Sequence, residues 1–482
     1  MSNRLTPLDV SFLYLEERTT VMHVGSVMVF DPPADGFDYD VLLRHLGARI
    51  AFVPRYRQRV RQVPLRLANP VWVDDERFDL TYHVRRSALP RPGSMEQLRD
   101  LVARVQPRHL DRSRPLWEVY VVEGLEGGRF ALVTKTHQAL VDGVNAVDLS
   151  QVLLDDTPSP TRSPADTWHP SREPSLVELV SGAVGDAIRR PTQVVDTLRA
   201  GVGDLRATAD QALGALGGLA LAARTAANPA PHSPLNVEIG VHRRFSTVAT
   251  ELEDYRAVRA FHATGGRRRT GRSAPTSGVG VSVNDVVLAT LTGALREWLL
   301  TRGGKVDPTT LLRAMVPVSV RAVAPGGAGP IAATVESHLV DLPLGESNPV
   351  LRLQQVAYQM KAHADTGRAV PARRLAEVGG FAPSTLHSLG ARVASGLSRR
   401  VFNLVITNVP GPQHRLYAAG AEMVEGYPVI PLAKGQGLAI GLTSYRGGVY
   451  YGLNADREVV PDVDVLGQCI VESLAELRET VP

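Results

Sequence analysis

The chain has 482 residues, of which 44% are hydrophobic and 21% are charged. That length is sufficient for two domains, each with its own core, and the composition is typical of a soluble globular protein. The formal net charge is +4, but only four of the 53 basic residues are lysines. A chain this rich in arginine, alanine, glycine and proline reflects coding bias as much as selection for a polyanion, so the charge does not favour nucleic-acid binding.

The single cysteine, Cys469, excludes an internal disulfide framework and fits a reducing cytosol. Residues 1–17 carry charges through their middle, so we expect no secretory signal peptide. The longest charge-free apolar run near the centre, residues 211–223, is too short and too glycine-rich to span a bilayer, which needs about 20 apolar residues. We therefore expect a cytoplasmic protein without a membrane-spanning segment.

The first 155 residues alternate short apolar runs with segments of helical spacing, and we predict that residues 1–155 form one domain. One helix is well marked, because Ser94 and Gln97 are placed as in a capping box. The predicted elements are a strand at 24–30, a helix at 39–50, a loop at 86–93, the helix that follows Ser94, and strands at 115–123 and 129–135 joined by a turn at 127–128.

A polar turn follows the last of these strands. The β-prone run 130–136 leads into His137–Gly143, and residues 144–149 then have the pattern of a helix start. A strand that stops to present a histidine, with Asp-Gly five residues later, is a common way to hold a reactive imidazole in a cleft. Strand alternation places Gln138 on one face and His137 on the other.

Residues 156–233 are predicted to connect two domains. Residues 156–174 are rich in proline, serine and threonine, and residues 175–228 form a weakly amphipathic helical stretch. This stretch is either a surface connector or, because its polar face carries arginines, an element that touches membrane or lipid.

Residues 234–482 are predicted to form a second α/β domain, which ends in a helix at 462–479. Ser282 and Asn284 are candidate caps of a helix at 282–296. The other predicted elements are strands at 243–250, 312–320, 401–408, 437–443 and 448–452, and a flexible basic loop at 265–273.

Several segments of the chain resemble a known family. His137-Gln-Ala-Leu-Val-Asp142-Gly143 resembles the H-H-x-x-x-D-G signature of the CoA-dependent acyltransferase superfamily, with Gln138 in place of the second histidine. In order and spacing, further segments resemble the bacterial wax ester synthase/diacylglycerol acyltransferase family and are similar to actinobacterial triacylglycerol synthases. These segments are Leu8–Leu13, Met22–Gly25, Pro115–Glu118, Pro234–Asn236, Asn284-Asp285, Val316–Arg321 and Thr407–Pro412.

The resemblance covers nearly the whole chain and implies a fold and an activity. The implied fold is α/β, with two chloramphenicol-acetyltransferase-like domains of mixed sheets and flanking helices that enclose a central tunnel. The implied activity is transfer of a long-chain fatty acyl group from acyl-CoA, a co-substrate, to diacylglycerol or a long-chain alcohol, with no other cofactor. Because these acyl substrates partition into lipid while the chain lacks a spanning segment, we expect peripheral attachment to the inner face of the plasma membrane or to lipid droplets.

The replacement at the second motif position leaves alternatives open. In the family this histidine takes the proton of the alcohol, whereas the carboxamide of Gln138 is neutral and cannot accept a proton as imidazole does. The chain is then an acyltransferase or an impaired relative that binds acyl-CoA or neutral lipid; a condensation-type enzyme that makes another ester or amide is a third option. His137 either turns toward the reactants or braces the motif turn.

The resemblance assigns roles to the remaining site residues. Asp142 either orients the base or is structural and pairs with an arginine, for which Arg321 is the candidate, and Gly143 allows a tight turn. Asn284 either supports the thioester carbonyl and oxyanion or caps its helix. A rigid turn that contains Asn408, Pro410 and Gly411 is expected to shape the tunnel mouth.

The sequence assigns no residues to CoA. The cluster at 267–269 is a candidate for the CoA phosphates, anionic lipid heads or nucleic acid, or is a solvated loop. Because no aromatic interleaving or nucleic-acid module accompanies it, we expect no nucleic-acid partner. We also find no metal-ligand spacing, no phosphate-binding glycine loop and no nucleophile elbow. These absences argue against metal-assisted, nucleotide-driven and acyl-enzyme mechanisms.

Overall fold

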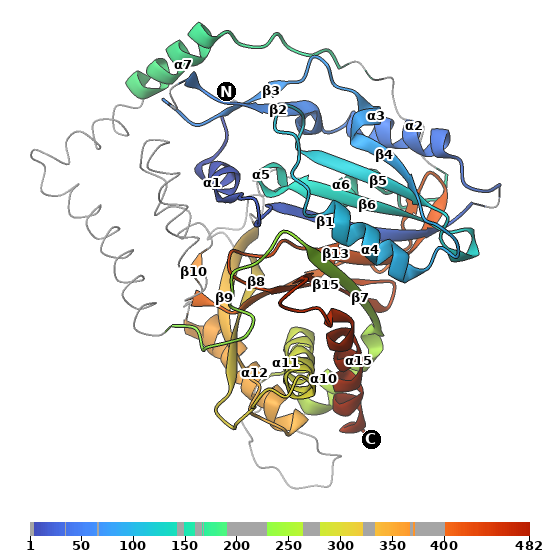
Figure 1. The fold of residues 1–482 in the computed structure, drawn as a ribbon, viewed down its shortest axis with the longest axis vertical. Coiled ribbons are helices and arrows are strands. Elements are labelled where there is room, and N and C mark those ends of the chain that lie inside the picture. Colours follow the sequence, from blue (N-terminus) through green and yellow to red (C-terminus); the bar gives the residue numbers. More distant parts are fainter. Residues whose placement is uncertain are drawn as a thin grey trace, which may run out of the picture.

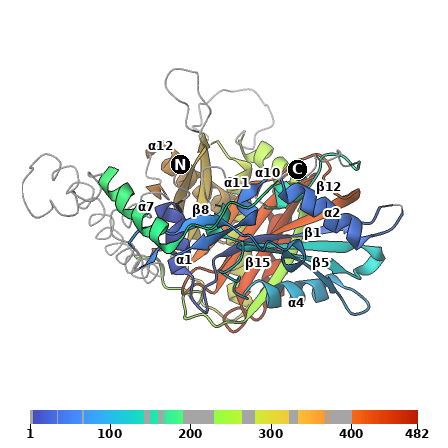
Figure 2. The same ribbon diagram turned by 90° about the horizontal axis from the view of Figure 1, so that it is seen from above.

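The computed structural model describes most of the chain, and each of its two lobes is built on a sheet (Figure 1). Seen from above, α1 (Pro7–Leu15) and α7 (Leu176–Arg189) lie on the side of the molecule opposite α2 (Tyr39–Ile50) (Figure 2). The described residues are 4–33, 35–64, 67–141, 149–159, 166, 168–189, 229–263, 280–321, 333–366, 370–371 and 401–482.

A sheet of six strands forms the centre of the first lobe, in the order β12-β13-β1-β6-β5-β4. Its strands are β1 (His23–Asp31), β4 (Val84–Ala88), β5 (Trp117–Glu123), β6 (Phe130–His137), β12 (Tyr417–Ala418) and β13 (Ala421–Val429). Every residue of β6 is buried. The sheet is therefore covered on both faces along its central strand.

The two faces of this sheet belong to different parts of the core. Phe30, Phe130 and Leu132 pack with Leu42 and Leu46 of α2. The opposite face packs on α4 (Met95–Val105), whose first turn is closed by the predicted capping box of Ser94 and Gln97. Smaller elements complete the lobe: η1 (Pro54–Arg57), β2 (Gln58–Arg61), β3 (Val71–Asp74), α3 (Leu80–His83), η3 (Glu126–Gly128), α5 (Gln138–Val141) and α6 (Leu149–Leu153).

The second lobe contains a seven-stranded sheet in the order β10-β9-β8-β11-β14-β15-β7. Four helices, α10 (Leu252–Ala263), α11 (Val283–Thr301), α12 (Pro349–Thr366) and α15 (Val463–Glu479), share one apolar core with it. The strands are β7 (Arg243–Glu251), β8 (Leu311–Arg321), β9 (Ala333–Pro343), β10 (Val370–Pro371), β11 (Leu404–Pro410), β14 (Leu438–Tyr445) and β15 (Gly448–Asp456).

The chain crosses between the lobes after β11 and returns before β14. Strand β13 pairs antiparallel with β1, with Gly25 opposite Val429 and Asp31 opposite Glu422. The sequence assigned residues 417–429 to the second domain, whereas these backbone hydrogen bonds place them in the sheet of the first. Apolar periodicity reports which face of a strand is buried but not which sheet the strand joins.

Two other expectations can be compared with the structure. Residues 86–93 were predicted as a loop, but residues 84–88 form β4, which pairs in parallel with β5. β4 is an edge strand with partly exposed side chains, so it tolerates the polar run Arg85-Arg86-Ser87. This run lacks the apolar pattern by which strands are recognised in a sequence. The described part of the predicted connector includes α7 and lies on the first lobe, where Arg57 forms an ion pair with Asp166 and Arg59 one with Glu173.

The helices of the second lobe meet at Gly293. A Cβ atom at this position would lie 2.2 Å from Ser473 Oγ and 2.6 Å from Arg352 Nη2, and both of these side chains are buried. We expect Gly293→Ala to lower the free energy of unfolding by about 1–3 kcal/mol, because overpacking forces neighbours to move. Chemical denaturation measures this, with Gly182→Ala as the matched control in the exposed part of α7. An equal effect of both variants would contradict the packing argument.

Candidate active site

The motif turn begins where β6 ends. The strand finishes at His137, and Gln138 already belongs to α5, so strand alternation does not continue to Gln138 as the sequence suggested. The His137 N–H donates to Leu116 O at 3.0 Å, and the Gln138 N–H donates to Met22 O at 2.8 Å. These two bonds hold the turn between β5 and the chain that leads into β1. The Gln138 side chain is half-buried.

The His137 imidazole is buried, with 1% of the residue exposed. Its Nδ1 accepts a hydrogen bond from the Ala139 N–H at 3.1 Å. Because a backbone N–H can only donate, the neutral ring must carry its proton on Nε2. Burial lowers the pKa of His137 to about 3, so the ring is neutral near pH 7. The only lone pair of the ring is thus engaged, and this geometry favours the interpretation of His137 as a brace of the turn.

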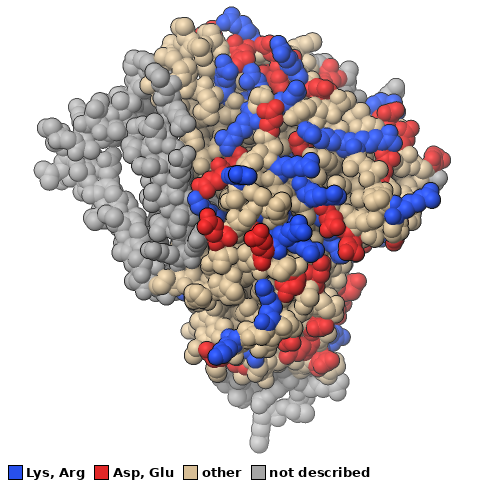
Figure 3. Space-filling view, in the orientation of Figure 1, with Lys and Arg blue, Asp and Glu red and all other residues tan. Residues whose placement is uncertain are grey.

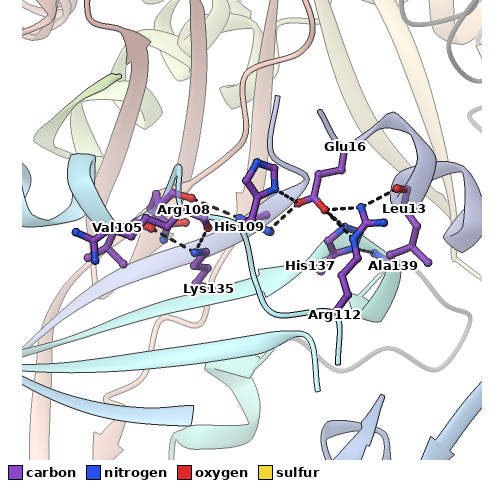
Figure 4. A network of polar contacts seen from close by, with 11 residues as sticks. Leu13, Glu16, Val105, Arg108, His109, Arg112, Lys135, His137 and Ala139 are labelled. Carbon is purple, nitrogen blue, oxygen red and sulfur yellow. Dashed lines mark hydrogen bonds and ion pairs between the residues drawn. The ribbon is translucent and has the colours of Figure 1, made fainter. Parts of the chain in front are cut away.

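The buried carboxylate of Glu16, the residue that ends α1, lies beside His137 (Figure 4). Arg112 Nη2 donates to Glu16 Oε2 at 2.6 Å, and His23 Nε2 lies 3.1 Å from Oε1. His109 Nδ1 is 3.4 Å from Oε1, and His137 Nε2 is 3.8 Å from Oε2. One arginine and three histidines therefore surround a single carboxylate, and we call these five residues the Glu16 cluster.

The cluster determines the charge of its members. Burial acts to raise the pKa of Glu16, but the hydrogen bonds from His23 and Arg112 and the electrostatic interaction with the His137 and His23 rings outweigh it and hold this pKa well below its ordinary value. Burial lowers the pKa of His23 despite the nearby carboxylate. At neutral pH the cluster therefore contains a carboxylate balanced by the Arg112 guanidinium.

The loop after α4 brings His109 and Arg112 to this carboxylate. Lys135, which is fully buried on β6, donates from Nζ to Val105 O at 3.3 Å and to Arg108 O (Figure 4). Burial lowers the pKa of Lys135 to about 8. Its ammonium group thus fixes the end of α4 and the chain that follows, a favourable site for a cation because helix carbonyls lack partners there.

The second lobe carries a pair of hydrogen-bonded asparagines on α11 and β11. Asn408 Nδ2 donates to Asn284 Oδ1 at 3.0 Å, and both side chains are half-buried. The cap of α11 is Ser282, which forms a capping box with Asp285, so the interpretation of Asn284 as the helix cap is wrong. With its oxygen occupied, the Asn284 amide keeps its N–H₂ group for another acceptor, which is the chemistry that a developing oxyanion requires.

The turn after Asn408 is tightly packed. Strand β11 ends at Pro410, and a Cβ atom on Gly411 would lie 2.4 Å from Ser444 O, so only glycine fits there without movement. The Gln413 side chain then bonds back to Gly411 O and to Ser444 Oγ. These contacts agree with a rigid turn at this end of β11.

Some predicted site residues cannot be placed. Asp142, Gly143 and the basic cluster 267–269 lie outside the described residues, as does the side chain of Arg321 at the end of β8. Within the described ranges there is no group of histidine, cysteine and acidic side chains that could hold a metal ion. No helix in the same ranges is long and apolar enough to cross a membrane.

Sequence reasoning missed the central residue of the cluster, Glu16, and also His109 and Arg112. The sequence marked His23 only as part of the segment Met22–Gly25 that resembles the family. The antiparallel pairing of β1 with β6 sets His23 directly opposite His137, and this long-range pairing has no local signal in the sequence. No local signal pointed to Glu16, since its neighbours come from chain segments far from α1.

Comparison with solved structures defines the class of fold. A wax ester synthase/diacylglycerol acyltransferase from Marinobacter aquaeolei VT8 matches with a TM-score of 0.67 and 29% identity, over 100% of both chains. The first condensation domain of the calcium-dependent antibiotic synthetase matches with a TM-score of 0.56 at 16% identity, over 99% of this chain and 96% of that one. The expected two-domain acyltransferase-like α/β fold is confirmed.

Sequence comparison defines the family. The wax ester synthase/diacylglycerol acyltransferase catalytic domain matches residues 5–266, and the WS/DGAT C-terminal domain matches residues 334–478. The chain belongs to this family. A probable diacylglycerol O-acyltransferase of Mycobacterium tuberculosis, tgs2, is 33% identical over 488 residues, 99% of each chain. Another from that organism, tgs3, is 46% identical over 261 residues, which are 54% of this chain and 96% of the relative.

The buried histidines make stability depend on pH. The folded His137 has a pKa of about 3, whereas an exposed histidine titrates near 6.5, so only the unfolded chain takes up this proton between those values. We therefore expect the free energy of unfolding to fall as the pH decreases from 6.5, by up to about 1.4 kcal/mol per pH unit for each such group.

Denaturation at pH 7, 6, 5 and 4 measures this slope. His137→Asn keeps an acceptor for the Ala139 N–H but cannot titrate, so the slope of this variant should be smaller. His232→Asn, at an exposed position, is the matched control. Equal slopes for wild type and His137→Asn would show that His137 does not contribute.

Proposed function

We propose that this protein is an O-acyltransferase that moves a long-chain fatty acyl group from acyl-CoA to the hydroxyl of diacylglycerol or of a long-chain alcohol. The product is then triacylglycerol or a wax ester. The observation that carries the proposal is family membership along the full chain, including a relative that is named a diacylglycerol O-acyltransferase and matches 99% of its length.

The reaction requires the alcohol oxygen to attack the thioester carbonyl and the carbon–sulfur bond to break, so that CoA departs and the alcohol proton ends on its thiol. The Asn284 amide, oriented by Asn408, is suited to support the carbonyl oxygen as it gains negative charge. Gln138 can hydrogen-bond the alcohol but cannot take its proton. Turnover then rests on holding the two reactants together and on stabilising the oxyanion, so we expect it to be slow.

A second function is favoured by the same turn. Gln138 cannot act as a base, and the lone pair of His137 already accepts the Ala139 N–H. A protein with this turn is also suited to bind acyl-CoA or neutral lipid without efficient transfer. The two functions differ in a single observable, which is product formation by the unmodified protein.

We further propose that the protein works at the surface of a membrane or lipid droplet on the cytoplasmic side. Its substrates partition into lipid, so a protein attached to the lipid surface can reach them without crossing the membrane. On the face shown in Figure 3, Lys and Arg side chains alternate with Asp and Glu. Such mixed charge does not favour nucleic acid, which calls for a basic surface.

The first test restores the missing base. Purified protein is incubated with radiolabelled palmitoyl-CoA and diolein or hexadecanol, and neutral lipid products are separated and counted. We expect Gln138→His to raise the rate about 10²- to 10⁴-fold, the usual contribution of a general base. Gln138→Asn is the matched control and should give no gain.

The outcomes separate the two functions. Slow product formation by the wild type, raised by Gln138→His, supports an acyltransferase. A silent wild type that becomes active in Gln138→His supports the impaired relative that binds its ligands. If neither protein forms product with any acyl-CoA or alcohol acceptor while both bind acyl-CoA tightly, the proposed transfer is wrong.

The asparagine pair gives a second test. Asn408→Asp removes the donor to Asn284 Oδ1 and offers an acceptor instead, which draws the Asn284 N–H₂ group toward residue 408. We expect kcat to fall about 10²- to 10³-fold in the Gln138→His background, the range for loss of an oxyanion donor. KM for acyl-CoA should change little. Asn236→Asp, at another asparagine of the second lobe, is the comparison variant, and an unchanged kcat in Asn408→Asp would refute the assignment.

A further inference from the structure

A short turn joins α1 to β1 and lies between the motif and the second lobe. It is closed by reciprocal backbone hydrogen bonds between Glu17 and Thr20, of 2.9 and 3.0 Å. We call residues Glu16–Thr20 the α1–β1 turn. Because Glu16 and Glu17 are adjacent, a shift of the backbone at one residue also moves the other.

One side of the α1–β1 turn is fastened to the second half of the chain. Lys434 Nζ donates to both carboxylate oxygens of Glu17 at 2.8 Å. Lys434 lies in residues 430–437, the segment in which the chain passes from β13 in the first sheet to β14 in the second. This ion pair therefore ties the turn to the point where the chain returns to the second lobe.

A second contact comes from a buried arginine. Arg243, at the start of β7, donates from Nη2 to Thr19 O, while its Nη1 lies 3.4 Å from Asp456 Oδ2. Both charged side chains are almost fully buried. Asp456 ends β15 and accepts backbone N–H groups of Gly240, Glu458 and Val459, so Arg243 has a rigid support. The second lobe thus contacts the α1–β1 turn at two residues, Glu17 and Thr19.

The other side of the turn reaches the motif. Glu16 places its carboxylate in the Glu16 cluster beside His137 (Figure 4). Two residues beyond the turn, Met22 O accepts the Gln138 N–H at 2.8 Å, and His23 then pairs with His137 in the sheet. Glu16 and Met22 contact the motif turn. They therefore lie on either side of Glu17 and Thr19, which the second lobe contacts.

We propose that Lys434 and Arg243 are positioning residues, which set the geometry of the His137–Gln138 turn through the α1–β1 turn. A shift of the second lobe would therefore change the geometry of the His137–Gln138 turn in the first lobe. For its meaning in catalysis this inference rests on the proposed acyltransferase function. The mechanical link itself is a property of the fold and can be measured without turnover.

Hydrogen–deuterium exchange of the full-length protein tests the link. In Lys434→Met we expect peptides that cover residues 136–141 to exchange about two- to fivefold faster, because loss of a partly exposed ion pair has an effect of this size on a local opening equilibrium. Glu17→Gln breaks the same pair from the other side and should have the same effect. Lys434→Arg should restore wild-type exchange, as should the charge-swapped double variant Glu17→Lys/Lys434→Glu.

Lys305→Met makes the same chemical change at an exposed lysine of the second lobe and is the matched control. The inference is overturned if Lys434→Met accelerates exchange only in residues 430–437, or if Lys305→Met affects residues 136–141 equally. In the Gln138→His background, Lys434→Met should lower kcat more than it raises KM for acyl-CoA. Absence of any turnover would count against the proposed function alone, since the exchange experiment still decides the link.

Discussion

The position of the motif turn depends on the ion pair and hydrogen bonds that satisfy the buried carboxylate of Glu16. A buried carboxylate is costly unless donors and cations surround it, and here Arg112 supplies both the charge and the hydrogen bonds. To reach Glu16, Arg112 needs the loop after α4, and Lys135 holds the start of that loop. The position of the motif turn therefore depends on two buried charges, Glu16 and Lys135, that must be satisfied together.

The same arrangement holds the motif histidine as a neutral, buried group. A ring that accepts a backbone N–H, lies fully buried and has a lowered pKa is stable as a neutral, immobile group. Catalysis by a base requires instead a lone pair that faces the substrate. His137 supports the turn, and Gln138 stands at the position where the resemblance implies a second histidine. The family pattern by itself therefore does not establish which members turn over quickly.

Much of the fold could be predicted from sequence because the signals are local. The helix Tyr39–Ile50 follows from its apolar spacing, and the start of α4 from the capping box of Ser94 and Gln97. Strand β4 was missed because arginines occupy an edge strand, and the place of β13 because strand pairing is a long-range choice. The family resemblance indicated His137 and Asn284, but the surroundings of the His137 ring include Glu16, which comes from the far N-terminal part of the chain.

The pairing of β13 with β1 also has a consequence for biosynthesis. Strand β1 ends at Asp31, whereas β13 begins at Ala421, so a ribosome makes one edge of β1 long before its partner. At ordinary translation rates of about 5–20 residues per second, that interval is roughly 20 to 80 s. During this time the nascent first lobe presents unpaired backbone groups along β1, a surface that favours aggregation unless it is shielded. The sheet of the first lobe can therefore be completed only after β13 has been synthesised.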